Sequence, residues 1–353
     1  MATDAALADE LVGTIRSWVA KEVIPGASRF EHADEYPEAW VEQMKAFGLF
    51  GARIPESHGG LGLDVLTYAR LMEELAYGWM SLAGVLNTHT IAANLIERFG
   101  TPEQHDRWLP MMATGERRAA FSLSEPDAGS DTQAIRCKAL PDGGEYVING
   151  TKMWVTNGVR AGLVALAAKT PEGITCFIIE KDPGESFGGI KVSRTIDKLG
   201  YKGIETVEMS YTDHRVPAST VLGGPDGLGH GLHYILGSLE LGRINIAARA
   251  LGVARAALDA SMRYVHERET FGVPIHKHQA IQFKLADMAT KVEASRLMVR
   301  SAAERFEAGD RADVEAGMAK LFCSETAFEV ATEAMRIHGG YGYTTDFPVE
   351  RYY

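Results

Sequence analysis

Two short stretches of the sequence carry side chains that could hold a flat ligand. In "YVINGTKMWVTNG", Trp154 and Thr156 stand two residues apart on a predicted strand, so their side chains lie on the same face of the sheet. An indole there can stack on a flat heteroaromatic ring while the hydroxyl bonds the edge of that ring. Ser124, in "FSLSEPDAGSD", ends the preceding strand and offers a second hydroxyl. The alternatives are that Trp154 is a core aromatic residue and that the polar loop is a solvated turn.

The sequence lacks the usual loops for phosphate and the usual clusters for metal. It contains no GxxxxGK[ST] motif, and no GxGxxG follows a strand and opens a helix. The closest histidine pair, His276 and His278, has no further clustered ligands, so we expect no metal site. A nucleotide, if one binds, must be held in another way.

The composition is that of a globular protein without an affinity for polyanions. Acidic residues outnumber basic ones, 47 to 36, and the formal net charge of -11 argues against a nucleic-acid partner. The three cysteines form no CxxC pair, and the N-terminus is neither a signal peptide nor a transit peptide, so we expect a cytoplasmic location. No stretch of about 18 apolar residues occurs, so we expect no membrane span.

Helical and strand patterns follow one another in three blocks. Residues 1–118 have the helical period, and "FGTPEQ" predicts a helix start in which Thr101 and Gln104 form a capping box. Residues 119–228 alternate as strands do, with turns such as "PDGG", "ING" and "TNG", and predict a β-domain. Helical segments of about thirty residues or more return in residues 229–353 and predict a helix bundle and an oligomer. This order of helices, sheet and helices is typical of an α+β fold.

Four motifs in this order closely resemble the acyl-CoA dehydrogenase family of flavoproteins: "FSLSEPDAGSD", "YVINGTKMWVTNG", "HERETFGVPIHKHQAIQFKLADM" and "MRIHGGYGYTTDFPVERYY". The resemblance covers essentially the whole chain, and four ordered matches are far more specific than one. It implies an N-terminal helical domain (1–118), a middle β-barrel or sandwich domain (119–228) and a C-terminal four-helix bundle (229–353). It also implies FAD as the cofactor and a homotetramer as the assembly.

The resemblance implies two groups of FAD contacts. The first surrounds the flavin ring, which an indole packs against and which backbone and hydroxyl groups hydrogen-bond; it comprises Phe121, Leu123, Ser124, Trp154 and Thr156. The second is offered to the adenosine and pyrophosphate of a neighbouring subunit's FAD; it comprises Arg268, Phe271, Gln279, Arg336, Gly339 and Gly340. Arg336 departs from the family pattern, which has Gln or Glu at this position, although a cation can still meet a pyrophosphate.

Three further residues match positions that meet the acyl-CoA substrate. Ser130 resembles a serine near the pantetheine arm, and Glu240 and Arg243 match residues that approach the pantetheine and the catalytic loop. From the residues alone, Glu240 is equally a solvated helix acid. For Arg268, the residues alone favour a surface salt bridge within "HERE" over a ligand contact.

The family reaction needs a carboxylate base, and the resemblance places none within this sequence. The base removes a proton next to the thioester carbonyl, and hydride from the next carbon passes to the flavin. In most members the base follows the stretch that matches "PVERYY", so we expect it beyond Tyr353. A smaller branch carries it at the position of Gly242, and Glu240 lies about 200° round the helix from there. The expected product is a trans-2-enoyl-CoA, and the expected electron acceptor is an electron-transferring flavoprotein.

Two other classes of function stay open at this point. The same fold serves flavin oxidases and monooxygenases, which pass electrons to oxygen. An FAD-stabilised assembly protein without catalytic activity would use the same scaffold. The length and branching of the acyl chain cannot be read from the sequence, because the apolar residues of an acyl pocket look like those of any core.

Overall fold

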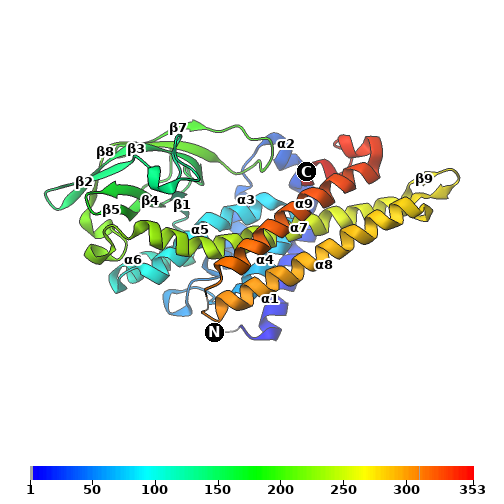
Figure 1. Cartoon of the computed structure of the whole chain (residues 1–353), viewed down its shortest axis with the longest axis horizontal. Coiled ribbons are helices and arrows are strands. Elements are labelled where there is room, and N and C mark those ends of the chain that lie inside the picture. Colours follow the sequence, from blue (N-terminus) through cyan, green and yellow to red (C-terminus); the bar gives the residue numbers. More distant parts are fainter. Residues whose placement is uncertain (1–2, 310) are drawn as a thin grey trace. The chain divides into compact units, whose positions relative to one another are not determined.

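The computed structural model describes residues 3–309 and 311–353 and divides into two compact units. The helical unit contains the segments up to Ala33, Asp64–Ala83 and Glu240–Tyr353, and the sheet unit contains Asp34–Leu63 and Gly84–Leu239. Each unit joins segments that are far apart in the sequence, as the colours in Figure 1 show. The predicted α+β fold, with helices, then a sheet, then helices along the chain, is confirmed.

The helical unit consists of long helices and one short hairpin. Its elements are α1 (Ala5–Trp18), α2 (Ile24–Ala33), α4 (Val65–Gly78), most of α7 (Gly231–Glu267), β9 (Glu269–Thr270), β10 (Val273–Pro274), α8 (Gln279–Glu307), α9 (Asp313–His338) and α10 (Val349–Tyr352). The helix α7 has 37 residues, which confirms the prediction of very long helices. The helix α4 packs on both α1 and α8, and α8 packs on α9 (Figure 1). Among the described residues, the C-terminal block thus holds three long helices and the four-residue α10.

The sheet unit packs one mixed sheet against helices. Its elements are α3 (Glu38–Ala46), most of α5 (Met80–Phe99), α6 (Pro102–Ala113), β1 (Ala119–Ser122), β2 (Lys138–Asp142), β3 (Glu145–Thr156), β4 (Leu163–Thr170), β5 (Gly173–Glu180), β6 (Ser186–Phe187), β7 (Ile190–Thr195) and β8 (Thr206–Pro217). The strand order is β1-β4-β2-β3-β8-β7-β6, with β5 paired to β4. Strand β1 runs parallel to β4, and β3 runs antiparallel to β8. In the described part of the chain, no helix is long and apolar enough to cross a bilayer.

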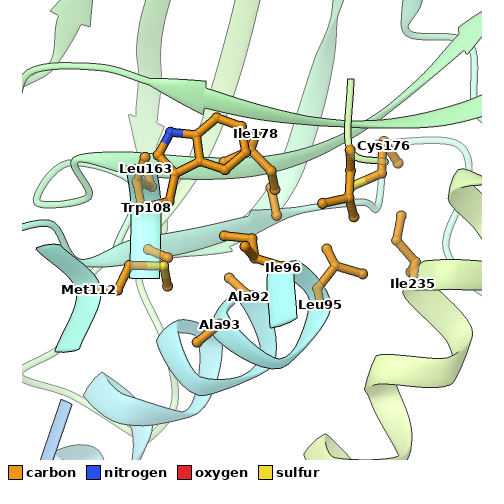
Figure 2. Packing of buried hydrophobic residues seen from close by; sticks show 14 of the residues in the cluster. Ala92, Ala93, Leu95, Ile96, Trp108, Met112, Leu163, Cys176, Ile178 and Ile235 are labelled. Carbon is orange, nitrogen blue, oxygen red and sulfur yellow. The ribbon is translucent and has the colours of Figure 1, made fainter. Parts of the chain in front are cut away.

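Strand β4 is buried on both faces, because alternate residues of "LVALAA" join two different hydrophobic clusters. Successive side chains of a strand point to opposite faces, so a strand between two cores must be apolar at every position. Figure 2 shows the cluster on one face, where Leu95 and Ile96 of α5 and Trp108 of α6 pack against Leu163 and Ile178 of the sheet. The helices α5 and α6 therefore cover this face of the sheet.

The predicted capping box at the start of α6 is confirmed. The backbone N–H of Gln104 donates to Thr101 Oγ1 at 3.4 Å, and the N–H of Thr101 donates to Gln104 Oε1 at 3.1 Å. Gln104 Nε2 also donates to the carbonyl of Val221 at 2.7 Å. Gln104, whose side chain caps the first turn of α6, thus also ties this helix to the segment after β8.

Strand β3 departs from the regular strand that the sequence predicted. Lys152 pairs with Met209 and Val155 pairs with Val207, so β3 has one residue more than β8 over this stretch and forms a bulge. Trp154, within the bulge, has a left-handed φ of 63°. On a regular strand Trp154 and Thr156 would lie on the same face, but here the bulge sets the direction of the Trp154 side chain.

The helix α7 begins in close contact with strand β5 of the sheet. A Cβ on Gly231 would lie 2.3 Å from the backbone nitrogen of Cys176 in β5, whereas a Cβ on Gly237 would meet only side-chain atoms, the nearest at 3.6 Å. Gly231→Ala is therefore expected to lower the free energy of unfolding by about 1–3 kcal/mol through overpacking. Gly237→Ala, on the same helix, should leave it unchanged or raise it by about 0.5–1 kcal/mol. Urea unfolding of the two variants checks this, and equal stability of the two would contradict the close packing of α7 on β5.

Candidate functional site

The loop after β1, which carries Ser124, is fixed to β3 by a buried lysine. Lys152 Nζ donates to the carbonyl of Leu123 at 2.8 Å and to Glu125 Oε1 at 2.9 Å, and the lysine side chain is 0% exposed. The carbonyl of Ser124 accepts the backbone N–H of Met153 at 2.8 Å. Ser124 therefore lies against β3 immediately beside the bulge.

The carboxylate of Glu125 is the acceptor at the centre of this attachment. Besides Lys152, it accepts the backbone N–H groups of Arg136 at 2.6 Å and Cys137 at 2.9 Å. Burial opposes ionisation of Glu125, but the hydrogen bonds from Lys152 and the two amides outweigh it and hold the pKa of the carboxyl below its usual value. Burial in turn lowers the pKa of Lys152. The pair joins the loop after β1, the segment before β2 and strand β3.

Trp154 is not a core aromatic residue, so the alternative raised by the sequence is wrong. Its side chain is 59% exposed, whereas the neighbouring Val155 is buried and Thr156 is half-buried. Exposing a large indole on a strand whose flanks are buried leaves a flat apolar surface that a ring can cover. The loop residue Ser124 is half-buried and Ser130, further along the same loop, is exposed.

Phe121 and Leu123 serve the core as well as the proposed site. Both side chains are half-buried and pack against the cluster shown in Figure 2. Phe121 also pairs with Ala165 through the parallel ladder of β1 and β4. Their backbone is therefore held in the sheet from one side while the loop that follows is held by Lys152 from the other.

Asn157 is a structural residue of this site that the sequence pattern marked only as part of a turn. It is buried and has a φ of 63°, which asparagine tolerates better than most residues. Its Nδ2 donates to the carbonyl of Val85 at 3.1 Å and to Thr88 Oγ1 at 3.0 Å, both in α5. The end of β3 that carries Thr156 is thus anchored to helix α5.

The second group of predicted residues lies in the helical unit around a pocket of about 590 Å³. Of the predicted residues, the structure brings together Arg268, Gly339 and Gly340, which all line this pocket. Phe271 lies at the tip of the β9–β10 hairpin and is 96% exposed, and Gln279 is the exposed first residue of α8; neither lines the pocket. The other lining residues are Tyr264, Thr270, Ile275, His278, Ile281, Ile337, His338, Tyr341 and Thr344.

The two arginines assigned to this group differ in their surroundings. Arg336 is ion-paired to Glu333 and does not line the pocket. Arg268 makes no ion pair with any residue of 3–309 or 311–353, so the salt bridge within "HERE" that the sequence alone favoured is absent there. An exposed guanidinium without a carboxylate partner at the rim of a pocket is suited to a phosphate.

His338, which sequence reasoning missed, lies in the wall of the same pocket and is only 2% exposed. Its Nδ1 bonds to the carbonyl of Ala334 at 2.8 Å, and its Nε2 is buried without a partner. Its ring stacks on Tyr264 with 4.1 Å between the ring centroids. Burial lowers the pKa of His338. The histidine of "RIHGG" was visible in the sequence, but only the fold shows that it lines the pocket.

Glu240 and Arg243 lie three residues apart on α7, and both are half-buried. Residues at this spacing are neighbours on a helix surface. Gly242 is buried between them in the sequence and offers no side chain. In the residues that the structure describes, no group of three or more His, Cys, Asp or Glu side chains is arranged to hold a metal ion.

Each unit by itself offers groups that suit part of a nucleotide-like ligand. The sheet unit offers an exposed indole beside small hydroxyl residues on a rigid backbone. The helical unit offers a pocket with apolar walls, one arginine without an ion pair and one buried ring nitrogen without a partner. The sheet unit thus offers a stacking surface, and the helical unit separately offers groups for phosphate binding and hydrogen bonding.

Known proteins match the chain along nearly its full length. The family descriptions "Acyl-CoA dehydrogenase, N-terminal domain", "Acyl-CoA dehydrogenase, middle domain" and "Acyl-CoA dehydrogenase, C-terminal domain" match residues 7–116, 120–214 and 229–353. A protein of Bacillus subtilis (strain 168) named "Acyl-CoA dehydrogenase" is 39% identical over 343 residues, which cover 96% of this chain and 89% of that protein.

Two solved structures are similar in both sequence and fold. The structure of butyryl-CoA dehydrogenase from Megasphaera elsdenii has a TM-score of 0.94 and 34% identity, and the match covers 99% of this chain and 92% of that chain. A chain in the structure of the electron transferring flavoprotein of Acidaminococcus fermentans has a TM-score of 0.93 and 36% identity, with the same coverages of 99% and 92%.

The buried pair of Glu125 and Lys152 can be tested by removing one charge and then both. Lys152→Met leaves a buried carboxylate without its cation and is expected to lower the free energy of unfolding by about 3–5 kcal/mol. Glu125→Gln combined with Lys152→Met removes both charges and should restore most of this loss in a double-mutant cycle. Arg215→Met, which breaks only an exposed ion pair with Asp142 and Glu145, should cost about 1 kcal/mol or less. If Lys152→Met is as stable as Arg215→Met, the pair does not hold the loop.

Proposed function

Since the chain belongs to the acyl-CoA dehydrogenase family, whose members are flavoprotein oxidoreductases, we propose that it binds FAD and oxidises an acyl-CoA thioester. The reaction is α,β-dehydrogenation to a trans-2-enoyl-CoA. The electrons pass to an electron-transferring flavoprotein, a proposal supported by the similarity to a chain in the A. fermentans structure.

The exposed indole of Trp154 is the observation that carries this proposal. The indole lies in a bulge of β3 between buried residues. Lys152 bonds this strand to the loop after β1, and Asn157 bonds its end to α5. In our proposal the indole packs against the flavin ring, and the backbone of Leu123 with the hydroxyls of Ser124 and Thr156 bonds its edge. Phe121 completes this group from strand β1.

Bound FAD would supply the acceptor for the hydride that leaves the β-carbon. The residues proposed for its adenosine and pyrophosphate are Arg268, Phe271, Gln279, Arg336, Gly339 and Gly340. Of these, Arg268 is supported most by the structure, because its guanidinium lines the pocket without an ion pair. Arg336 is supported least, because Glu333 already binds it.

The substrate contacts proposed for this chain are Ser130, Glu240 and Arg243. The exposure of Ser130 and the adjacent positions of the other two on α7 are compatible with contacts to a pantetheine arm. No residue of the chain is assigned as the base that removes the α-proton. Position 242, where a smaller branch of the family carries it, is a buried glycine.

The assembly proposed is a homotetramer, and an apolar stripe on α9 supports an interface. Val314, Met318, Leu321 and Phe328 are all exposed and recur at helical spacing along one side of α9. Exposed apolar side chains gathered on one stripe mark interaction surfaces. The division into domains at 118/119 and 228/229 and a cytoplasmic location stay predictions from the sequence.

Arg268 provides the test of FAD binding. The parent protein is expected to purify with bound FAD, and Arg268→Ala should weaken FAD binding by about 1.5–3 kcal/mol, the range for a charge-assisted contact. Arg300→Ala, which removes an exposed arginine of α8 that is ion-paired to Glu304, is the matched control and should bind FAD like the parent. Reconstitution followed by flavin fluorescence measures both. A parent protein that takes up no FAD rejects the proposed function, and unchanged affinity in Arg268→Ala rejects the assignment of this residue.

The absence of an assigned base is tested by adding a carboxylate. Anaerobic bleaching of the flavin by an acyl-CoA is expected to become faster in Gly242→Glu, toward the roughly 10²–10⁴-fold that a positioned base contributes. Glu240→Gln should leave the bleaching rate at saturating acyl-CoA unchanged and weaken only substrate binding, because residue 240 lies about 200° round the helix from position 242. If Glu240→Gln abolishes bleaching while FAD content stays normal, Glu240 is the base.

A further inference from the structure

His338 lines the pocket of the helical unit, and its buried Nε2 has no hydrogen-bond partner among the described residues. We propose that Nε2 of His338 accepts a hydrogen bond from an amino or hydroxyl group of the nucleoside in this pocket. His338 would thereby favour nucleotides that carry a hydrogen-bond donor within reach of Nε2. This inference rests on the proposed function, because the nucleotide is the adenosine half of FAD.

The state of the imidazole follows from its other nitrogen. Nδ1 bonds to the carbonyl of Ala334 at 2.8 Å, and a carbonyl can only accept, so Nδ1 carries the proton. A neutral imidazole with its proton on Nδ1 has a bare lone pair on Nε2. Burial lowers the pKa of His338 and thus favours this neutral form. Nε2 therefore acts as an acceptor and requires a donor on the ligand.

The ring cannot easily turn away from the pocket. It stacks on Tyr264 at 4.1 Å between centroids, and the hydroxyl of Tyr264 donates to the backbone carbonyl of His338 at 3.2 Å. Phe347 packs in T-shaped contacts against both rings, with 5.2 Å between its centroid and each of theirs. The acceptor is thus held in place before any ligand arrives, which reduces the ordering cost of binding.

An unpaired buried nitrogen is unfavourable unless a ligand bonds to it. Buried polar atoms nearly always have a hydrogen-bond partner, and leaving one without a partner costs stability. His278 in the same wall differs, because its Nε2 is paired with Thr270 Oγ1 at 2.8 Å. The pocket therefore holds one histidine that is satisfied within the chain and one that is not.

The rest of the pocket suits the remaining parts of a nucleotide. The side chains of Ile275, Ile281 and Ile337 form apolar walls for a purine, and Arg268 offers an unpaired guanidinium to phosphate. A nucleoside diphosphate has an apolar face, donors on its base and ribose, and an anionic end. The three kinds of group in the wall match these three parts.

The experiment compares dinucleotides that differ in one donor. The full chain, stripped of cofactor, is titrated with FAD, with flavin hypoxanthine dinucleotide, in which an oxo group replaces the purine amino group, and with FAD bearing a 2′-deoxyribose in its adenosine. Binding is followed by flavin fluorescence. The parent protein is expected to bind at least one analogue about ten-fold more weakly than FAD, the cost of leaving a buried acceptor unpaired. Which analogue loses affinity identifies the group that meets His338.

Two variants decide whether His338 causes the preference. His338→Phe should reduce the preference to about two-fold or less, and His338→Gln, whose amide oxygen can accept in place of Nε2, should keep part of it. His278→Phe is the matched control from the same wall and should keep the full preference. Equal affinity of the parent for all three dinucleotides overturns the inference whether or not the variants fold, and so does a preference that survives in His338→Phe. Failure of the parent to bind FAD at all rejects the proposed function instead.

Discussion

The contact between Glu125 and Lys152 is the constraint on which the candidate flavin surface depends. A lysine without solvent exposure must bring its charge to an anion, and here that anion also accepts two backbone amides. One carboxylate thus fixes the loop after β1, the segment before β2 and strand β3 in a single arrangement. Replacing the pair by apolar side chains could preserve stability, but it would remove the directional bonds that hold the backbone of Ser124 beside the bulge.

The backbone around Trp154 is strained, and the strain is supported from both sides. Trp154 and Asn157 both have a φ of 63°, a conformation that side chains with a Cβ adopt rarely. Lys152 secures the residues before the bulge, and the amide of Asn157 bonds to Val85 and Thr88 of α5 after it. An exposed aromatic side chain on such a rigid support is arranged before a ligand binds, and this arrangement is what a stacking surface requires.

Features encoded in a few consecutive residues could be predicted from the sequence, and features made by distant pairs could not. The capping box of Thr101 and Gln104 spans four residues, so its pattern alone gives the start of α6. The sequence predicted a stacking role for Trp154 from a regular strand, but the indole lies in a bulge, which arises from the pairing of β3 with β8. The role of Lys152 depends on its contact with Glu125, and that of His338 depends on the pocket around the end of α9. No rule of sequence spacing brings such distant groups together. The resemblance grouped Arg268 with Phe271 and Gln279, whereas in the structure only Arg268 of these three lines the pocket.

The discontinuous make-up of the helical unit has a consequence for biosynthesis. The helix α4 packs on α8, yet about 200 residues separate Gly78 from Gln279, and translation at about 5–20 residues per second takes roughly 10–40 s to cover them. During that interval α4 has left the ribosome without α8, on which it packs, while the remaining segments of the sheet unit are completed by Leu239. Because this long loop closes late in synthesis, the face of α4 that packs on α8 stays exposed on the nascent chain, and exposed apolar surface of this kind favours aggregation.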